Sequence, residues 1–181
     1  KNKKIPTLAI VNVIGSTIAR EADYVFYTLA GPEISVATTK AYSAQLIAGD
    51  LLAIQMAYMK GKIDSEGYKK LIIELQKIPN LIEKILLDSK ERIQWFASKY
   101  ANAKDVFFIG RGIDYAVSME GSLKLKEISY IHSEAYAAGE LKHGTISLIE
   151  DNILVISILT QSELYEKMIS NMVEVKCRGA Y

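Results

Sequence analysis

The chain has 181 residues, half of them hydrophobic, and its 22 Lys and Arg residues balance 21 Asp and Glu residues. Such a chain can bury a substantial core, which excludes a disordered or fibrous protein. The charge balance leaves no excess of cations for binding the phosphates of nucleic acid. The longest apolar stretch, 46–59, is interrupted by Asp50 and Gln55 and is too short to span a membrane. We therefore expect neither a nucleic-acid nor a membrane partner.

The only cysteine, Cys177, excludes an internal disulfide framework and fits a reducing compartment, so we expect a cytoplasmic protein. Packing explains Cys177 better than nucleophilic catalysis, because neither His132 nor His143 lies near it in sequence. Two isolated histidines also lack zinc-type spacing, and we expect no metal. The chain begins without Met and stops at Tyr181, just after a predicted helix, so we interpret it as a fragment.

The order of elements along the chain predicts an α/β fold. Apolar, β-rich runs predict strands at 8–13, 24–29, 105–109 and 153–159. Helical patterns predict helices at 39–60, 65–78, 80–100, 115–131 and 162–176. Pro79 marks a break between the second and third of these helices. Strands that alternate with helices favour βαβ units in an open, largely parallel sheet flanked by helices.

Two loops next to these elements carry candidate binding residues. Glu33, Thr38 and Thr39 precede the long helix at 39–60; capping is the first explanation, with Thr38 or Thr39 as N-cap, and ligand contact is the second. Gly110-Arg111-Gly112 follows a strand, and ligands of parallel sheets usually bind beyond the carboxyl ends of the strands. A tight turn explains such glycines more often than a phosphate cradle does.

The clearest chemical signal is a charged stripe on the helix at 115–131. At about 100° per residue, Glu120, Lys124 and Glu127 fall within a sector of roughly 60°, so their polar groups can meet. Ordinary ion pairs on a solvated face explain many such stripes. Here apolar residues surround the stripe: Val117, Met119, Leu123, Leu125 and Ile128. We therefore expect much of this helix to contact protein, as is common around catalytic carboxylates.

Two histidines follow the stripe. His143 lies in the turn Gly139-Glu-Leu-Lys-His-Gly144, where a functional and a structural role are equally favoured. His132 is expected near the end of the helix, where a structural interaction with the last carbonyls is favoured. A carboxylate, an ammonium and an imidazole together suit proton transfer next to a carbonyl, as in the interconversion of aldose and ketose sugars. That chemistry needs no cofactor.

The segments 120–132 and 134–144 resemble the isomerase region of the glutamine:fructose-6-phosphate amidotransferase family. Segments 31–41 and 108–112 support the resemblance, which runs through nearly the whole chain in order. The family has two SIS (sugar isomerase) domains with flavodoxin-like parallel sheets, and it forms homodimers. The resemblance implies three regions in this chain: the second half of the first SIS domain at 1–62, a helical linker at 63–102, and the first half of the second SIS domain at 103–181.

The resemblance also implies a reaction and roles for single residues. The family converts fructose 6-phosphate and glutamine into glucosamine 6-phosphate and glutamate. Glu127 matches the base that moves a proton between C1 and C2 of the sugar, Lys124 its charged neighbour and Glu120 a nearby acidic position. His143 matches a histidine that assists sugar ring opening from the partner subunit. Val36 and Thr38 match positions that line the sugar site.

The chain also departs from the family pattern. The 181 residues contain no glutaminase cysteine, no Ser-Gln-Ser-Gly-Glu-Thr phosphate loop and no C-terminal tail with the Schiff-base lysine, so we expect this chain alone to be inactive. Thr145 stands where the family usually has Pro, and we expect it to loosen the turn of His143. Two alternatives stay open: a regulator that senses sugar phosphates through a SIS domain, and a related isomerase or deglycase of amino-sugar phosphates.

Overall fold

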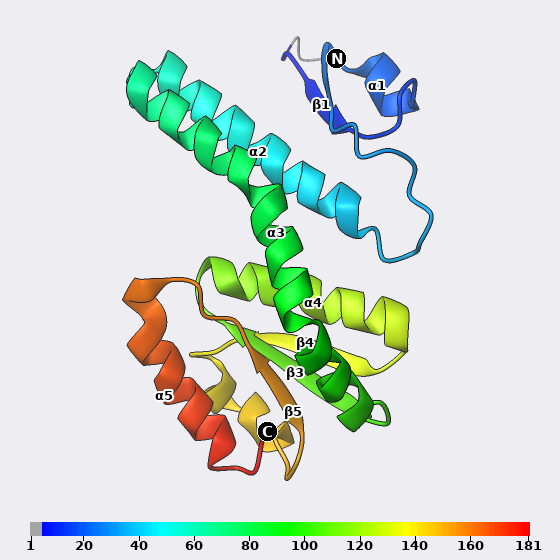
Figure 1. Ribbon diagram of the computed structural model, residues 1–181, viewed down its shortest axis with the longest axis vertical. Coiled ribbons are helices and arrows are strands. Elements are labelled where there is room, and N and C mark those ends of the chain that lie inside the picture. Colours follow the sequence, from blue (N-terminus) through cyan, green and yellow to red (C-terminus); the bar gives the residue numbers. More distant parts are fainter. Residues whose placement is uncertain (1–4) are drawn as a thin grey trace. The chain divides into compact units, whose positions relative to one another are not determined.

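The computed structural model describes residues 5–181, and the chain divides into two compact units, residues 1–90 and 91–181 (Figure 1). The N-terminal unit contains β1 (Leu8–Val11), α1 (Thr17–Glu21), β2 (Tyr24–Tyr27), α2 (Thr39–Met59) and most of α3 (Ser65–Lys99). Strands β1 and β2 pair in parallel. Both predicted strands are therefore confirmed, although each ends earlier than predicted, and the short helix α1 between them was not predicted.

The N-terminus of α2 is capped by a carboxylate from the preceding loop. Glu33 Oε1 accepts a hydrogen bond from the backbone N–H of Ala41 at 2.9 Å. Thr38 precedes the helix in a left-handed conformation, and its hydroxyl donates to the Val36 carbonyl instead of capping the helix. Thr38 is therefore the N-cap residue, as expected, but Glu33 and not Thr38 supplies the side-chain capping bond. An anionic cap suits this helix end, because the first N–H groups carry partial positive charge.

Helix α3 is continuous from Ser65 to Lys99 with Pro79 inside it, so the predicted break at Pro79 was wrong. A proline removes one main-chain hydrogen bond and crowds the preceding turn. The many remaining hydrogen bonds of this 35-residue helix keep it continuous through that position.

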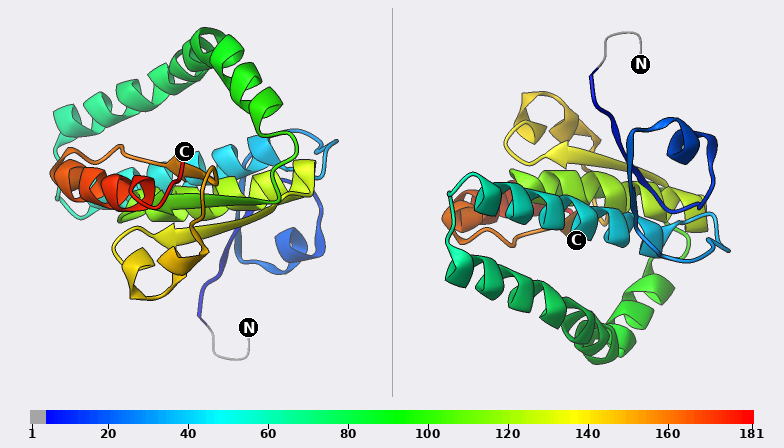
Figure 2. Two further views of the ribbon diagram at one scale, coloured as in Figure 1. Left: turned by 90° about the horizontal axis from the view of Figure 1, so that it is seen from below. Right: turned by 90° about the horizontal axis from the view of Figure 1, so that it is seen from above.

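The C-terminal unit is built on three parallel strands. These are β3 (Asp105–Gly110), β4 (His132–Ala137) and β5 (Leu154–Ser157), in the order β4-β3-β5. Helix α4 (Ile113–Ser129) connects β3 to β4, and helix α5 (Tyr165–Lys176) follows β5; Figure 2 shows both helices beside the strands. Short 3-10 segments lie at Leu141–His143, Thr145–Leu148 and Ser162–Leu164. The parallel α/β fold predicted from the sequence is confirmed.

The two faces of β3 pack against different helices. Phe107 and Ile109 join the buried core with Met168 and Val175 of α5. Phe108 points to the opposite face, as successive side chains of a strand do, and its ring lies against Gly121 of α4. A Cβ atom at Gly121 would lie 2.9 Å from that ring. Helices therefore cover both faces of this strand.

Small residues bring α4 close to the sheet. Its buried positions are Asp114, Ser118 and Ser122, spaced four residues apart, and the Ser122 hydroxyl meets that of Ser133 in β4 at 3.1 Å. The larger apolar residues point away from the sheet and are more than two fifths exposed: Val117, Met119, Leu123 and Ile128. The expectation that they contact protein was therefore wrong for these four, because the small residues occupy the face toward the sheet.

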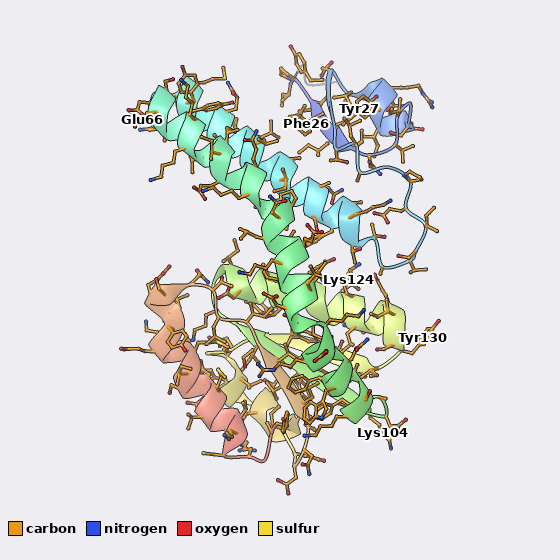
Figure 3. All side chains as sticks on the ribbon, in the orientation of Figure 1. Phe26, Tyr27, Glu66, Lys104, Lys124 and Tyr130 are labelled. Carbon is orange, nitrogen blue, oxygen red and sulfur yellow. The ribbon has the colours of Figure 1, made fainter. Side chains whose placement is uncertain are left out.

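Strand β4 was missed in the sequence. The predicted helix ran to residue 131, whereas α4 ends at Ser129 and Tyr130 forms a left-handed C-cap (Figure 3). A tyrosine is an unusual residue for that conformation, so no glycine signals the helix end. The strand sequence His-Ser-Glu-Ala-Tyr-Ala is polar and small, and it lacks the apolar run that would mark a buried strand.

Replacing two helical glycines tests the close approach of α4. Gly49→Ala in α2 has open space around its new methyl group and is expected to stabilise by about 0.5–1 kcal/mol, because alanine favours a helix. Gly121→Ala forces its methyl group against the Phe108 ring and is expected to destabilise by about 1–3 kcal/mol. Urea unfolding of both variants measures the difference. An equal gain in stability at both positions would show that α4 does not pack this tightly.

Candidate active site

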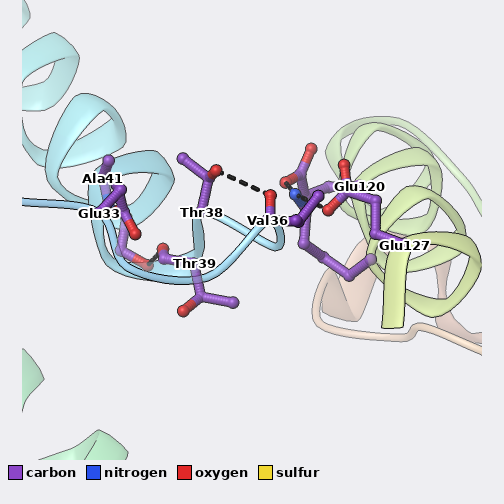
Figure 4. Close-up of polar contacts among 9 residues, drawn as sticks. Glu33, Val36, Thr38, Thr39, Ala41, Glu120 and Glu127 are labelled. Carbon is purple, nitrogen blue, oxygen red and sulfur yellow. Dashed lines mark hydrogen bonds and ion pairs between the residues drawn. The ribbon is translucent and has the colours of Figure 1, made fainter. Parts of the chain in front are cut away.

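Glu120, Lys124 and Glu127 form one continuous ion-pair ladder on α4 (Figure 4). Lys124 Nζ lies 2.7 Å from Glu127 Oε2 and 3.4 Å from Glu120 Oε1. Each of the three side chains is about one fifth exposed. The spacing predicted that these groups meet, and the structure brings all three together.

Lys124 stays charged between the carboxylates of Glu120 and Glu127. Its hydrogen bond to Glu127 raises the pKa of Lys124 above its ordinary 10.5; partial burial opposes the shift, and the negative charges of Glu127 and Glu120 add to it. The shorter bond uses Oε2 of Glu127, and Oε1 lies outside that bond. A fixed ammonium beside a carboxylate holds that carboxylate in one orientation. Such a pair suits a general base whose second oxygen takes a proton from a substrate.

His143 lies in a turn that is held by hydrogen bonds, and its side chain is exposed to solvent. Its backbone N–H donates to the Glu140 carbonyl at 3.0 Å, and the neighbouring Leu141 is almost fully buried. Thr145, which we expected to loosen this turn, donates its hydroxyl to the Leu141 carbonyl at 3.2 Å. In the described part of the chain, we find no hydrogen bond or ion pair of the His143 imidazole. The structure therefore does not join His143 to the ladder.

His132 begins strand β4, so its expected place near the end of a helix was wrong. Its Nδ1 lies 2.7 Å from Asp105 Oδ1, and its Nε2 lies 3.6 Å from Glu134 Oε1. Asp105 is its register partner on β3. The contact with Asp105 joins the first residues of two neighbouring strands, which supports a structural role.

Glu134 also accepts a hydrogen bond from the hydroxyl of Tyr136, two residues along the same strand face. This hydrogen bond, together with burial and the charge of Glu134, raises the pKa of Tyr136 to about 12. Tyr136 therefore stays neutral and serves as a hydrogen-bond donor at physiological pH.

The other two candidates, Val36 and Thr38, belong to the N-terminal unit. Both lie in the loop ahead of α2, where the Thr38 hydroxyl donates to the Val36 carbonyl at 3.0 Å (Figure 4). The Val36 side chain is exposed, and Thr38 is partly buried with a φ of 52°. Together with the Glu33 cap, this bond gives the loop a defined shape at the start of α2.

One buried cluster was missed in the sequence. Asp114 lies directly after the turn at Gly110-Arg111-Gly112 and accepts hydrogen bonds from Thr160, 46 positions later. A Cβ atom at Gly110 would lie 2.5 Å from the Asp114 carbonyl, so close packing of the turn explains this glycine. An aspartate in the first turn of a helix was the one available signal, but the sequence does not reveal its distant partner.

Residues 5–181 contain neither a metal-binding cluster nor a membrane-spanning helix. No three His, Cys, Asp or Glu side chains in this range are grouped closely enough to hold a metal ion. None of the helices in the same range is long and apolar enough to cross a membrane.

The parallel strands, the helices on both faces of β3 and the charged ladder of α4 define an α/β domain suited to acid/base chemistry. The chain belongs to the SIS domain family, whose model matches residues 1–55 and 99–181.

Two similar proteins share a single name. The chain is 60% identical over 181 residues to the glutamine–fructose-6-phosphate aminotransferase [isomerizing] of Caldanaerobacter subterraneus subsp. tengcongensis, covering all of this chain and 30% of that protein. It is 55% identical over 180 residues to the protein of the same name from Clostridium tetani, covering 99% of this chain and 29% of that one. The chain thus spans about three tenths of the length of these relatives.

Solved structures show the same fold. The C-terminal domain of glucosamine-fructose-6-phosphate aminotransferase from Francisella tularensis matches with a TM-score of 0.93 and 38% identity, over 99% of this chain and 51% of that one. Glucosamine-6-phosphate deaminase from Thermotoga maritima matches with a TM-score of 0.66 and 22% identity, over 96% and 50% of the two chains. The second similarity concerns the fold alone.

The alkaline titration of Lys124 tests the ladder. Glu127→Gln removes the hydrogen bond that contributes most to the raised pKa of Lys124, so that pKa is expected to fall toward 10.5. The signal of the lysine Cε carbon in ¹³C NMR, followed through the alkaline range, measures it. Wild type should lose stability as the pH rises from 10.5 through the raised folded pKa of Lys124, and this loss should be smaller in the variant, because the pH-linked stability disappears as the folded pKa approaches the unfolded one.

Glu74→Gln is the matched control, since Glu74 pairs with the exposed Lys77 at 2.6 Å on α3. The Lys124 titration should be unchanged in that variant. An unchanged titration in Glu127→Gln as well would mean that the 2.7 Å ion pair does not persist in solution.

Proposed function

We propose that this chain is part of the isomerase region of a glutamine:fructose-6-phosphate aminotransferase. The whole enzyme would convert fructose 6-phosphate and glutamine into glucosamine 6-phosphate and glutamate. The observation that carries the proposal is 60% identity through all 181 residues to a relative with that name. The ladder on α4 supports it, because this reaction needs a positioned base next to a sugar carbonyl carbon.

In the proposed reaction, Glu127 moves a proton between C1 and C2 of the sugar. The ammonium of Lys124 holds Glu127 Oε2, which leaves Oε1 to take up the proton and return it. Lys124 also offsets the charge of Glu120, so that two carboxylates can lie on one stripe without strong repulsion. Glu120 thereby helps to fix Lys124 and is a positioning residue.

His143 is proposed to open the sugar ring, acting from the partner subunit of a homodimer. Its exposed imidazole in a braced turn is suited to reaching a site on another chain. An imidazole can donate or accept a proton near neutral pH, as ring opening requires.

The remaining assignments follow from the same relationship. Val36 and Thr38 are proposed to line the sugar site, and the defined shape of their loop is consistent with a binding role. We assign residues 1–62 to the second half of a first SIS domain, 63–102 to a helical linker and 103–181 to the first half of a second SIS domain. A cytoplasmic location is proposed, where both substrates of the reaction are available.

Glu127→Gln in the full-length protein tests the base. The amide keeps the shape of the side chain but cannot take up the proton, so formation of glucosamine 6-phosphate should fall by roughly 10²–10⁴-fold. Hydrolysis of glutamine, measured in the same preparation, serves as the internal control and should change little. If both rates stay near wild type, Glu127 is not the base.

His143→Asn tests ring opening and its location together. The rate with the cyclic sugar should fall more than the rate with an open-chain analogue, because only the cyclic form needs the imidazole. An equimolar, re-associated mixture of His143→Asn and Glu127→Gln proteins should recover about a quarter of the wild-type activity on the cyclic sugar, since half of the dimers are mixed and each of these has one intact site. No recovery would place His143 and Glu127 in the same subunit's site, and equal losses on both sugars would exclude ring opening.

A further inference from the structure

Strand β5 has an outer edge that can accept another strand. Within residues 5–181, β5 pairs along one edge with β3, and no further strand lies along its other edge. In a parallel sheet, the backbone groups of alternate residues point to opposite edges. Ile158 donates its N–H to the Ile109 carbonyl on the β3 side, so the N–H groups of Val155 and Ser157 point to the outer edge. Such an edge can bind an extended segment through main-chain hydrogen bonds.

The last residue of the chain begins this kind of pairing. Tyr181 donates its N–H to the Ile153 carbonyl at 2.9 Å, and its own carbonyl accepts the N–H of Val155 at 3.0 Å. The two partners of Tyr181 flank Leu154, which is the hydrogen-bond pattern of two parallel strands. The chain therefore enters the outer edge of β5 at Tyr181, and this pairing sets the register.

The side chains at this point alternate between the two faces of the sheet. Ala180 packs against the buried core on the α5 side. The Tyr181 ring lies beside α3 instead, with its centroid 6.0 Å from that of Phe96 and 5.6 Å from that of Tyr100. Alternation of this kind is typical of a strand. The first and third residues after Tyr181 should therefore point toward α5, as Ala180 does.

An apolar groove lies on the face to which those two residues should point. It has a volume of about 480 Å³ and extends between β5 and α5 from Tyr181 onward. Its lining residues include Val155, Ser157, Ile169, Met172 and Val173. Val173 is 54% exposed although it lies in the groove. Covering such apolar surface with other apolar side chains is favourable.

We propose that this edge and groove form the docking site of the segment that follows Tyr181 in the full-length protein, which binds as a parallel strand beside β5. The register at Tyr181 pairs the second residue after it with Ile156. The first and third residues after Tyr181 are apolar and fill the groove against α5. The proposal rests on the proposed function only in that the whole enzyme is longer than these 181 residues, as its relatives are.

Paired cysteines in the full-length protein test the register. In a background that carries Cys177→Ser, Ile156→Cys is combined with a cysteine at the second residue after Tyr181. These positions face each other in the proposed register, within the roughly 4.4–6.8 Å between Cα atoms that a disulfide spans. Mass spectrometry of the oxidised, non-reduced digest should show a disulfide within one chain.

A cysteine at the first residue after Tyr181 is the matched control, because its side chain points to the other face of the sheet. No disulfide with Ile156→Cys is expected there. Equal cross-linking at both positions, or none at either, overturns the proposal. A disulfide between two chains also overturns it, because a second copy of the protein then occupies the edge.

Hydrogen exchange of the unsubstituted full-length protein is a second measurement. The N–H of Ser157 points to the outer edge, and pairing with the docked strand should slow its exchange by roughly 10²-fold or more compared with an unfolded peptide. Exchange of Ser157 at the unfolded rate contradicts the proposal.

Val173→Asn tests the groove in the full-length protein. The two residues have similar helix propensities, so an open groove would tolerate the change. Beneath a docked strand, the amide lacks partners and should lower the melting temperature by about 2–8 °C. Ser170→Asn is the matched control, because Ser170 is exposed on α5 outside the groove. Equal melting temperatures of Val173→Asn and wild type contradict the proposal. Cross-linking and melting need no turnover, so they can fail while Glu127→Gln behaves as proposed, and the reverse.

Discussion

Strand β3 is the element on which the C-terminal unit depends. It lies between β4 and β5 and is buried along nearly its whole length, with Phe107 and Ile109 facing α5 and Phe108 facing α4. A strand that contacts protein on both faces and both edges fixes its neighbours in register and distance. The stripe on α4 therefore has a defined position relative to the sheet.

The ladder and the buried Asp114 lie on the same helix, but their negative charges are stabilised differently. Glu120 and Glu127 share a cation that keeps them ionised near the surface. Asp114, deeper and at the helix start, is stabilised by N–H and O–H dipoles from a segment far away in sequence. The Lys124 ammonium is held by its two carboxylates near the surface, whereas the donors to Asp114 are held by the fold. The first arrangement suits chemistry, and the second stabilises the packing of the helix start.

Local patterns in the sequence were sufficient for part of this structure. The apolar run 105–109 and the spacing of Glu120, Lys124 and Glu127 depend only on residues within one element, so the strand and the ladder were predictable. Strand β4 was not, because its pairing with β3 compensates for a polar sequence that has no apolar pattern of its own. Asp114 was not either, because its partner Thr160 is brought to it by the tertiary fold. Pro79 shows the opposite case, where a strong local signal is overridden by a long helix.

The contact between Gly121 and Phe108 sets the rotation of α4 about its own axis. A Cβ atom at residue 121 would lie 2.9 Å from the ring, so a larger side chain there would force the helix or the ring to shift. A rotation by a single residue, about 100°, would carry Lys124 to another side of the helix. Gly121, which has no functional group, thus helps to set the direction in which the charged side chains of α4 point. Substitutions that change specificity on this helix must keep that orientation of α4.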